Sequence, residues 1–323
     1  MMDATDRSLY ADALRSATSE HTGRPLDAVL AELGWAEALT DDPRAAVEFL
    51  FENQGRVAHA SEALAIVVDA AAGSCAGTGD VLALPRPGHS GQPGTLDGDG
   101  RLSLRAVALR EPAADEQVVV ICAHDESDVA VQVPASAVRV RALHGIDPDH
   151  ELFELGTGPS GVEVDLAAAK LADWTSGLAA GRRAVAHELV GLSATMLALA
   201  REHALSRVQF GRPISGFQAV RHRLAETHVA VEGARAAADG AWDDCSPVSA
   251  SMAKAVAGRN ARVTMRHAQQ VLAGMGFTYE HQFHRYLRRA LLLDELLGSS
   301  RALTYELGVQ ILRTRRLPEL LPL

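Results

Sequence analysis

The chain has 323 residues, of which 47% are hydrophobic, and this combination is typical of a folded protein with sizeable cores. Its formal net charge of -10 argues against nucleic-acid binding, which normally requires clustered basic residues in excess. No apolar run approaches the length of a membrane span, and the first residues lack the pattern of an export signal, so we expect a cytoplasmic protein without a membrane partner.

The N-terminal part has the hydrophobic spacing of helices. Leucines and valines recur three and four residues apart from about Ser8, and a second helical run covers residues 45–68. Gly23, Gly34 and Pro43 separate the runs. We predict an N-terminal helical domain over residues 1–75.

The middle of the chain changes character. Glycine, proline and serine become frequent between Gly73 and Gly100, and short apolar or alternating runs separated by polar turns follow from Arg101 to Leu143. Such runs predict strands, so we expect a small β-domain over residues 76–176.

The C-terminal part returns to helical spacing. Val185, Leu189 and Leu192 begin one apolar helix face, which is predicted to end at Gly211 and Pro213. The later helices are predicted from Phe217, over 246–272, over 283–297 and over 300–312. The sequence therefore predicts an α+β fold whose residues 177–323 form an antiparallel four-helix bundle.

Two short stretches carry more information than periodicity. Residues 207–218 are RVQFGRPISGFQ, and residues 270–277 are QVLAGMGF. Each is predicted to be a helix end followed by a turn, with Arg207 or Gln270 beside glycines that let the backbone approach a ligand closely. This arrangement suits a diphosphate or a purine.

Both stretches resemble motifs of the acyl-CoA dehydrogenase family, RxxFGxP followed by FQ and then QxxGGxGF, in the same order. The resemblance covers about residues 177–300 and implies the acyl-CoA dehydrogenase fold with FAD as cofactor. In that family these elements reach across a dimer interface to an FAD held mainly by the neighbouring subunit.

The resemblance also implies roles for individual residues. Arg207 would pair with the pyrophosphate, Phe210 and Phe217 would pack near the adenosine portion, and Gln270 with the Gly274 loop would border the cofactor. Ala273 stands where the family commonly has glycine, which narrows the loop slightly and keeps its turn. Taken singly, each residue also has an ordinary explanation as a helix-end or core residue, whereas the ordered set favours the family.

The family's reaction removes a proton next to the thioester carbonyl, so it requires a carboxylate base. The resemblance places that glutamate either after the fourth helix of the bundle or early in the first. Leu297 and Arg182 occupy these positions, and neither is a base, so we expect no catalytic residue in this chain. Glu188 and Glu295 lie nearby in sequence and are expected to be solvated, although Glu295 remains a candidate for a displaced base.

The turn that precedes the strands is altered as well. Residues 84–91, LPRPGHSG, align with the family's TEPxxGSD and lack its threonine, glutamate and aspartate. A flavin site built from this β-domain is therefore expected to be damaged, and Trp174 is expected to be a packing residue. No metal-binding motif is present, so no metal is expected.

These features resemble the short, non-catalytic subunit of heterotetrameric α2β2 acyl-CoA dehydrogenases of actinobacterial steroid side-chain degradation. The resemblance implies a full-length partner subunit that supplies the glutamate, binds most of the acyl-CoA and shares the FAD, and a chain that is inactive alone. Two alternatives stay open: a flavin-free homodimeric scaffold, and a self-sufficient enzyme that uses Glu295.

Overall fold

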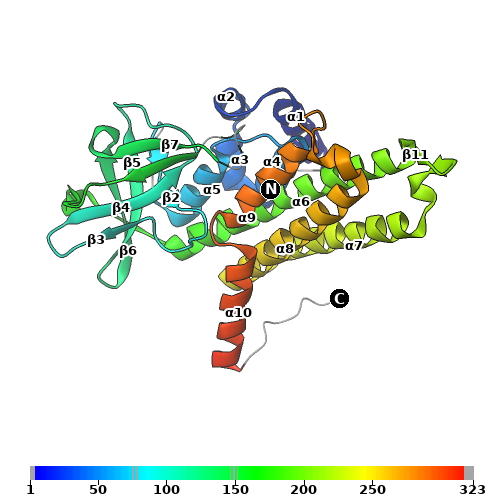
Figure 1. Cartoon of the computed structure of the whole chain (residues 1–323). Coiled ribbons are helices and arrows are strands. Elements are labelled where there is room, and N and C mark those ends of the chain that lie inside the picture. Colours follow the sequence, from blue (N-terminus) through cyan, green and yellow to red (C-terminus); the bar gives the residue numbers. More distant parts are fainter. Residues whose placement is uncertain are drawn as a thin grey trace. The chain divides into compact units, whose positions relative to one another are not determined.

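The computed structural model describes residues 4–74, 76–77, 79–145, 147, 150 and 152–315 (Figure 1). The predicted order of helices, then strands, then helices is confirmed. The chain divides into two compact units, one comprising Met1–Ala60, Arg183–Asp294 and Ser300–Leu323, the other Ser61–Arg182 and Glu295–Ser299. The boundaries of the three sequence-predicted domains stay predictions.

The N-terminal helices are shorter than the sequence pattern indicates. They are α1 (Ala4–Glu20), α2 (Arg24–Glu32), α3 (Trp35–Asp41), α4 (Pro43–Val57) and α5 (Ala63–Ala72). The prediction of one run over 45–68 is wrong, because the backbone of Ala58 turns left-handed (φ 52°). The next side chain, His59, brings Nδ1 to 2.7 Å from the carbonyl oxygen of Thr18 and 3.0 Å from that of His21. These contacts with a distant helix end hold the break.

A sheet forms the core of the second unit. Its strands are β1 (Val81–Leu82), β2 (Leu84–Pro85), β3 (Gly94–Leu96), β4 (Arg101–Ala108), β5 (Gln117–His124), β6 (Ser127–Pro134), β7 (Arg139–Leu143), β8 (Leu152–Gly156), β9 (Val162–Glu163) and β10 (Lys170–Ala172). The main path runs β10-β6-β5-β3-β4-β8-β7. Strand β4 alternates, with Leu102 and Leu104 buried and Ser103 and Arg105 exposed, so one face joins the core and the other meets solvent.

The last four C-terminal helices begin within one residue of the predicted positions, and two of the five helices end earlier than predicted. They are α6 (Trp174–Ser206), α7 (Gln218–Gly240), α8 (Pro247–Leu272), α9 (Phe283–Glu295) and α10 (Ser300–Thr314), with the short strands β11 (Val208–Gln209) and β12 (Arg212–Pro213) after α6. Helices α7 and α8 pack side by side (Figure 1). The predicted ends of α6 at Gly211 and of α9 at Leu297 are wrong, because both segments contain residues with positive φ that stop a helix. In the described part of the chain, no helix is long and apolar enough to cross a membrane.

Helices α4 and α6 cross with their backbones almost in contact. A Cβ on Gly55 would lie 2.2 Å from the carbonyl oxygen of Glu188, and a Cβ on Gly191 would lie 2.2 Å from that of Glu52. No side chain fits at either position, so the two glycines allow a crossing that any other residue would force apart. This contact fixes where the long helix α6 lies in its unit.

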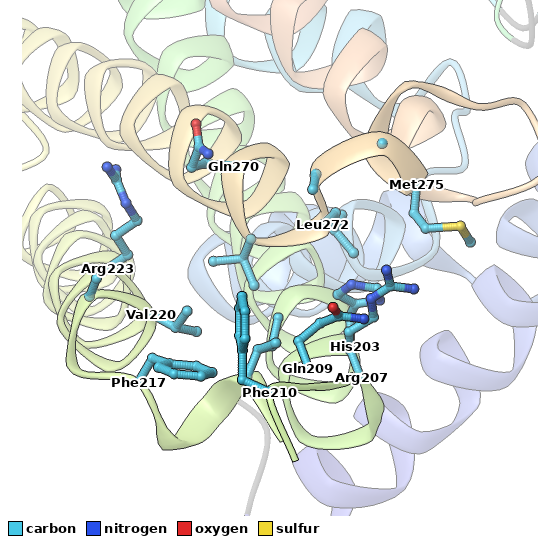
Figure 2. Close-up of a pocket in the computed structure, with 15 residues that line it drawn as sticks. His203, Arg207, Gln209, Phe210, Phe217, Val220, Arg223, Gln270, Leu272 and Met275 are labelled. Carbon is cyan, nitrogen blue, oxygen red and sulfur yellow. The ribbon is translucent and has the colours of Figure 1, made fainter. Parts of the chain in front are cut away.

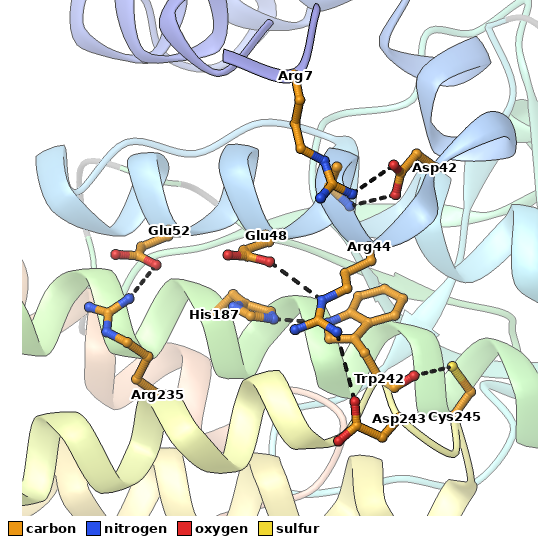
Figure 3. A network of polar contacts seen from close by, with 11 residues as sticks. Arg7, Asp42, Arg44, Glu48, Glu52, His187, Arg235, Trp242, Asp243 and Cys245 are labelled. Carbon is orange, nitrogen blue, oxygen red and sulfur yellow. Dashed lines mark hydrogen bonds and ion pairs between the residues drawn. The ribbon is translucent and has the colours of Figure 1, made fainter. Parts of the chain in front are cut away.

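A buried histidine sits beside this crossing. His187 is 1% exposed, and the indole Nε1 of Trp242 donates to its Nε2 at 3.0 Å (Figure 3). Burial is the largest cause that lowers the pKa of His187 to about 4; Glu52 opposes the shift, and the charges of Arg235 and Arg44 add to it. The hydrogen bond from Trp242 requires an unprotonated Nε2, so the native state holds this imidazole neutral.

Substituting a glycine of the α4–α6 crossing should destabilise the protein strongly. We expect Gly191→Ala to lower the free energy of unfolding by roughly 3 kcal/mol, because backbone atoms of the facing helix cannot move aside. Gly308→Ala in α10 is the matched control: a Cβ there meets nothing within 4 Å, and the change should stabilise the chain by about 0.5–1 kcal/mol through helix propensity. Urea unfolding followed by circular dichroism measures both. Equal changes in the free energy of unfolding for the two variants would show that the crossing is not tight.

His187 should make the protein less stable in mild acid. Its pKa is about 4 in the native state and 6.5 ordinarily, so the unfolded chain binds a proton between these values and the native chain does not. Stability therefore falls as the pH drops from 6.5 toward 4, by up to roughly 3 kcal/mol from this residue. His187→Gln keeps an acceptor for Trp242 and does not titrate, so its unfolding midpoint should depend less on pH in this window. An unchanged pH slope would remove His187 as the cause.

Candidate functional site

The first sequence motif folds as a tight hairpin at the end of α6. Strands β11 and β12 pair Val208 with Pro213 and Gln209 with Arg212, and leave a two-residue turn. Both turn residues, Phe210 and Gly211, have positive φ, 53° and 77°. Two positive φ values are the geometry of the turns that favour Asn-Gly in hairpins, so a phenylalanine here is strained.

Phe210 is also 91% exposed at the tip of this hairpin. Its ring meets Phe217 edge to face, with centroids 6.1 Å apart, and the guanidinium of Arg212 lies 4.3 Å from the Phe217 ring centroid. A strained backbone and an exposed aromatic ring both cost stability in an isolated chain. Their combination indicates a surface that another group covers.

The second motif forms the end of α8 and the short helix after it, η4 (Ala273–Phe277). Gln270 is exposed on the last turn of α8. Ala273 has φ 51° and ψ -130°, a conformation natural to glycine that costs another residue about 1–3 kcal/mol. A Cβ on Gly274 would meet nothing within 4 Å, whereas one on Gly276 would lie 3.2 Å from Leu272. Gly276 therefore serves packing, and Gly274 leaves the backbone open to a ligand.

The structure brings the two motifs together around one cavity of about 830 Å³ (Figure 2). The residues that sequence analysis assigned to the cofactor all line it: Arg207, Phe210, Phe217, Gln270 and Gly274. His203, Gln209, Arg223 and Met275 line it as well, and sequence analysis did not assign them. Arg223 lies one turn beyond Val220 on α7, so helical spacing after the FQ motif could have found it.

The charges in this cavity are positive. Arg207 and Arg223 are both exposed lining residues, and in the described part of the lining no acidic residue faces them. Burial lowers the pKa of His203, and the charge of Arg207 lowers it further, so His203 is held neutral at pH 7. Two guanidinium groups, two aromatic rings and an open glycine backbone fit a diphosphate joined to an aromatic base. The cofactor roles of these residues stay predictions.

The two positions where the family places its base lie against each other. Arg182 Nε donates to the carbonyl oxygen of Leu297 at 3.1 Å, and both residues are buried. A Cβ on Gly181 would lie 2.6 Å from Leu297 Cδ1, so the leucine side chain packs directly over this glycine. Leucine and a protonated guanidinium fill the space in which a carboxylate would act.

The acidic residues nearby differ from expectation. The prediction that Glu188 is solvated is wrong: it is 1% exposed, and its Oε1 accepts from Arg289 Nε at 2.8 Å. The packing of α9 on α6 in this unit buries the pair, which one-dimensional spacing did not reveal. Glu295 is half-buried, and its carbonyl oxygen accepts from the backbone N–H of Gly88 at 2.8 Å. Its role as a base is untested by this geometry.

The altered turn of residues 84–91 is held by packing. Trp174 is 4% exposed and donates from Nε1 to the carbonyl oxygen of Ser90 at 3.0 Å, which confirms that it is a packing residue. Leu84 and Pro85, both buried, stand where the family has threonine and glutamate. This turn does not fit a flavin that needs those polar groups. Among the described residues, no group of three or more His, Cys, Asp or Glu is placed to hold a metal ion.

Comparison with known sequences matches residues 171–308 to the family model described as acyl-CoA dehydrogenase, C-terminal domain. The acyl-CoA dehydrogenase IpdE2 of Mycobacterium tuberculosis is 35% identical over 127 residues, which are 39% of this chain and 40% of that protein. IpdE2 of Mycolicibacterium smegmatis is 36% identical over 117 residues, 36% of this chain and 38% of that protein. The match thus spans about two fifths of the length of these relatives.

Solved structures share the fold over nearly the whole chain. The ChsE4-ChsE5 complex of Mycobacterium tuberculosis matches with a TM-score of 0.79 at 20% identity, covering 99% of both chains. The Tcur3481-Tcur3483 steroid ACAD G363A variant matches with a TM-score of 0.78 at 20% identity, covering 97% of this chain and 99% of that one. The C-terminal sequence match and the shared fold agree with the two motifs around the cavity. Residues 171–308 therefore match the C-terminal domain of the acyl-CoA dehydrogenase family, and the chain has the acyl-CoA dehydrogenase fold.

Proposed function

We propose that this chain is one subunit of a heteromeric FAD-dependent acyl-CoA dehydrogenase, which introduces a double bond between the α and β carbons of an acyl-CoA thioester. The chain contributes contacts to an FAD across the interface, and the partner subunit supplies the catalytic glutamate. One observation carries the proposal: Leu297 and Arg182 close the base positions against each other, whereas the strained Phe210 hairpin stays exposed beside a cationic cavity.

The chemistry of the reaction divides naturally between two subunits. The flavin, when bound, accepts the hydride, and a carboxylate must take the proton from the α carbon. Leucine has no acceptor for that proton, and an arginine stays protonated at any physiological pH. In this proposal Arg207 binds the diphosphate, and Phe210 and Phe217 pack against the nucleoside. The acyl-CoA accordingly occupies mainly the pocket of the partner.

A different partner explains the structure better than a second copy of this chain. A homodimer would join two chains that both lack the base and both carry the altered turn at residues 84–91, so neither site would be complete. A full-length dehydrogenase subunit with an intact turn and glutamate would complete one site per pair. The fold likeness to ChsE4-ChsE5, which is named as a complex, and to a protein named as a steroid ACAD supports a heteromer whose substrate is a steroid side-chain CoA ester.

Purified alone, the chain should be colourless and without dehydrogenase activity, because it builds no complete flavin site. Co-expressed with a full-length acyl-CoA dehydrogenase subunit from the same genome, it should form a yellow complex with about one FAD per pair of unlike chains. Absorbance at the flavin band against protein mass, with activity on acyl-CoA, measures this. Stoichiometric FAD and activity on the lone chain would contradict the proposal in favour of Glu295 as base. A stable, flavin-free homodimer would favour a scaffold.

Arg207→Gln should weaken FAD retention in the complex. Losing one charge-assisted contact to a diphosphate costs roughly 1.5–3 kcal/mol, which corresponds to a rise in the FAD dissociation constant of about one to two orders of magnitude. Arg201→Gln is the matched control, because Arg201 is exposed on the same helix α6 and does not line the cavity. Flavin fluorescence during dialysis measures release. Equal retention in both variants would exclude a role of Arg207 at the interface.

A further inference from the structure

Helix α10 is anchored at its first residue. It belongs to the unit that contains α8, and it packs against that helix and extends beyond it (Figure 1). The backbone N–H of Ser300 donates to Asp294 Oδ1 at 3.0 Å, and the other carboxylate oxygen accepts from Arg262 Nε at 2.7 Å. Asp294 is 1% exposed. This buried carboxylate joins the end of α9 and the start of α10 to α8, so the direction in which α10 begins is fixed.

The inner side of α10 is fully packed only near its start. Leu303, Leu307 and Ile311 follow one another at four-residue spacing, so they lie on one side of the helix. Leu303 is fully buried, whereas Leu307 and Ile311 are half-buried. A helix of 15 residues is marginal in water without tertiary contacts. The later turns of α10 therefore receive little support from their own chain.

The opposite side of α10 carries a second apolar stripe, the outer stripe, formed by Tyr305, Val309 and Leu312. Their spacing of four and three residues places them together, about half a turn around the helix from Leu303. They are 73%, 46% and 72% exposed. The described part of the chain thus leaves all three uncovered. An apolar stripe on an anchored helix is typical of a surface that another chain covers.

Two oppositely charged residues flank the outer stripe on the same edge. Glu306 and Arg313 are seven residues apart, which is about two turns. Both are exposed, and within the described part of the chain neither side chain makes an ion pair or a hydrogen bond. The residues four positions before and after Glu306 are Ala302 and Gln310, so no base is placed to pair with it along the helix.

We propose that two copies of this chain pair through their outer stripes, with the two α10 helices antiparallel. In a two-fold antiparallel pair, each edge of one stripe lies beside the same edge of the other, so Glu306 of each copy meets Arg313 of the other copy. A parallel pair would set Glu306 against Glu306 and Arg313 against Arg313, and like charges repel. The outer stripe is thus complementary to itself in the antiparallel direction, which selects a second copy as its occupant.

This pairing is weak and is separate from the proposed flavin contact. One pair of helices of this length buries less surface than the roughly 1,200 Å² at which stable interfaces begin, so the dimer is reversible. In the described lining of the Arg207 cavity, no residue comes from α10. One copy can therefore take part in both contacts, and the inference does not depend on the proposed function.

Sedimentation equilibrium of the full chain over a range of concentrations tests the pairing. The unmodified chain should associate reversibly to a dimer as its concentration rises. Leu312→Gln should raise the dimer dissociation constant by at least about tenfold, because a symmetric dimer loses the apolar contact twice. Leu9→Gln is the matched control, since Leu9 is 65% exposed on helix α1, and it should associate as the unmodified chain does. Circular dichroism establishes that both variants are folded.

Charge exchange tests the antiparallel direction. Glu306→Arg and Arg313→Glu should each weaken self-association, because each sets like charges together twice. An equimolar mixture of these two variants, and the double variant with both changes, should associate as the unmodified chain does, since both restore opposite charges.

Four results would overturn the proposal. The unmodified chain could stay monomeric up to millimolar concentration, or Leu312→Gln could associate as strongly as the unmodified chain. Leu9→Gln could weaken association as much as Leu312→Gln, which would show a general effect of lost apolar surface. The mixture or the double variant could fail to associate, which would exclude the antiparallel contact between Glu306 and Arg313.

Discussion

The backbone contact between α4 and α6 is the constraint on which the helical unit depends. Gly55 and Gly191 each face a carbonyl oxygen of the other helix, so this crossing has no tolerance for a side chain. Once α6 is fixed there, the residues along it acquire their partners in the same unit. His187 meets Trp242 and Glu188 meets Arg289, both at buried positions on the faces of α6 that the crossing leaves available. The end of the same helix then delivers Arg207 and the β11–β12 hairpin to the edge of the cationic cavity. A tight contact between two backbones thus determines where the end of α6 and the cavity beside it lie, about four turns away, because a continuous helix transmits position along its axis.

The chain has a closed site at Leu297 and Arg182, where packing is favourable, and an exposed site at the Phe210 turn, where the conformation costs stability. Leu297 and Arg182 satisfy ordinary packing: the leucine is buried over Gly181, and the guanidinium donates to its carbonyl oxygen. The Phe210 turn does the reverse, since positive φ and an exposed ring both lower the stability of the isolated chain. A strained and exposed turn is retained when contacts with another molecule stabilise it. A position that no longer needs a catalytic side chain can be occupied by whichever residue packs best there. This contrast supports the proposal that the chain is one part of an assembly.

The chain has cavities lined by arginines although its net charge is -10. Arg207 and Arg223 line the cavity beside the Phe210 turn, and Arg105 and Arg139 line a second cavity in the sheet unit. Acidic side chains are absent from the described lining of both cavities. Other arginines are paired with carboxylates, as Arg289 is with Glu188 and Arg141 with Glu154. Net charge therefore says little about a binding site, because screening confines each charge to its immediate neighbours. The arrangement of pairs decides which cations remain available for a ligand.

The sequence by itself determined the order of helices and strands and the two motifs, and it predicted that Leu297 and Arg182 take the positions of the family's base. These depend on local spacing and residue type, which a linear pattern contains. Only the tertiary structure decided the rest. Glu188 is buried against Arg289, α6 stops before the Phe210 turn, and Gly156 pairs across the sheet with both Arg105 and Arg139. Each of these results depends on residues distant in sequence, or on a backbone conformation that the residue type disfavours. Each segment has several conformations that its residues allow locally. Strand pairing and helix crossing select one of them, and these contacts form only when the chain packs.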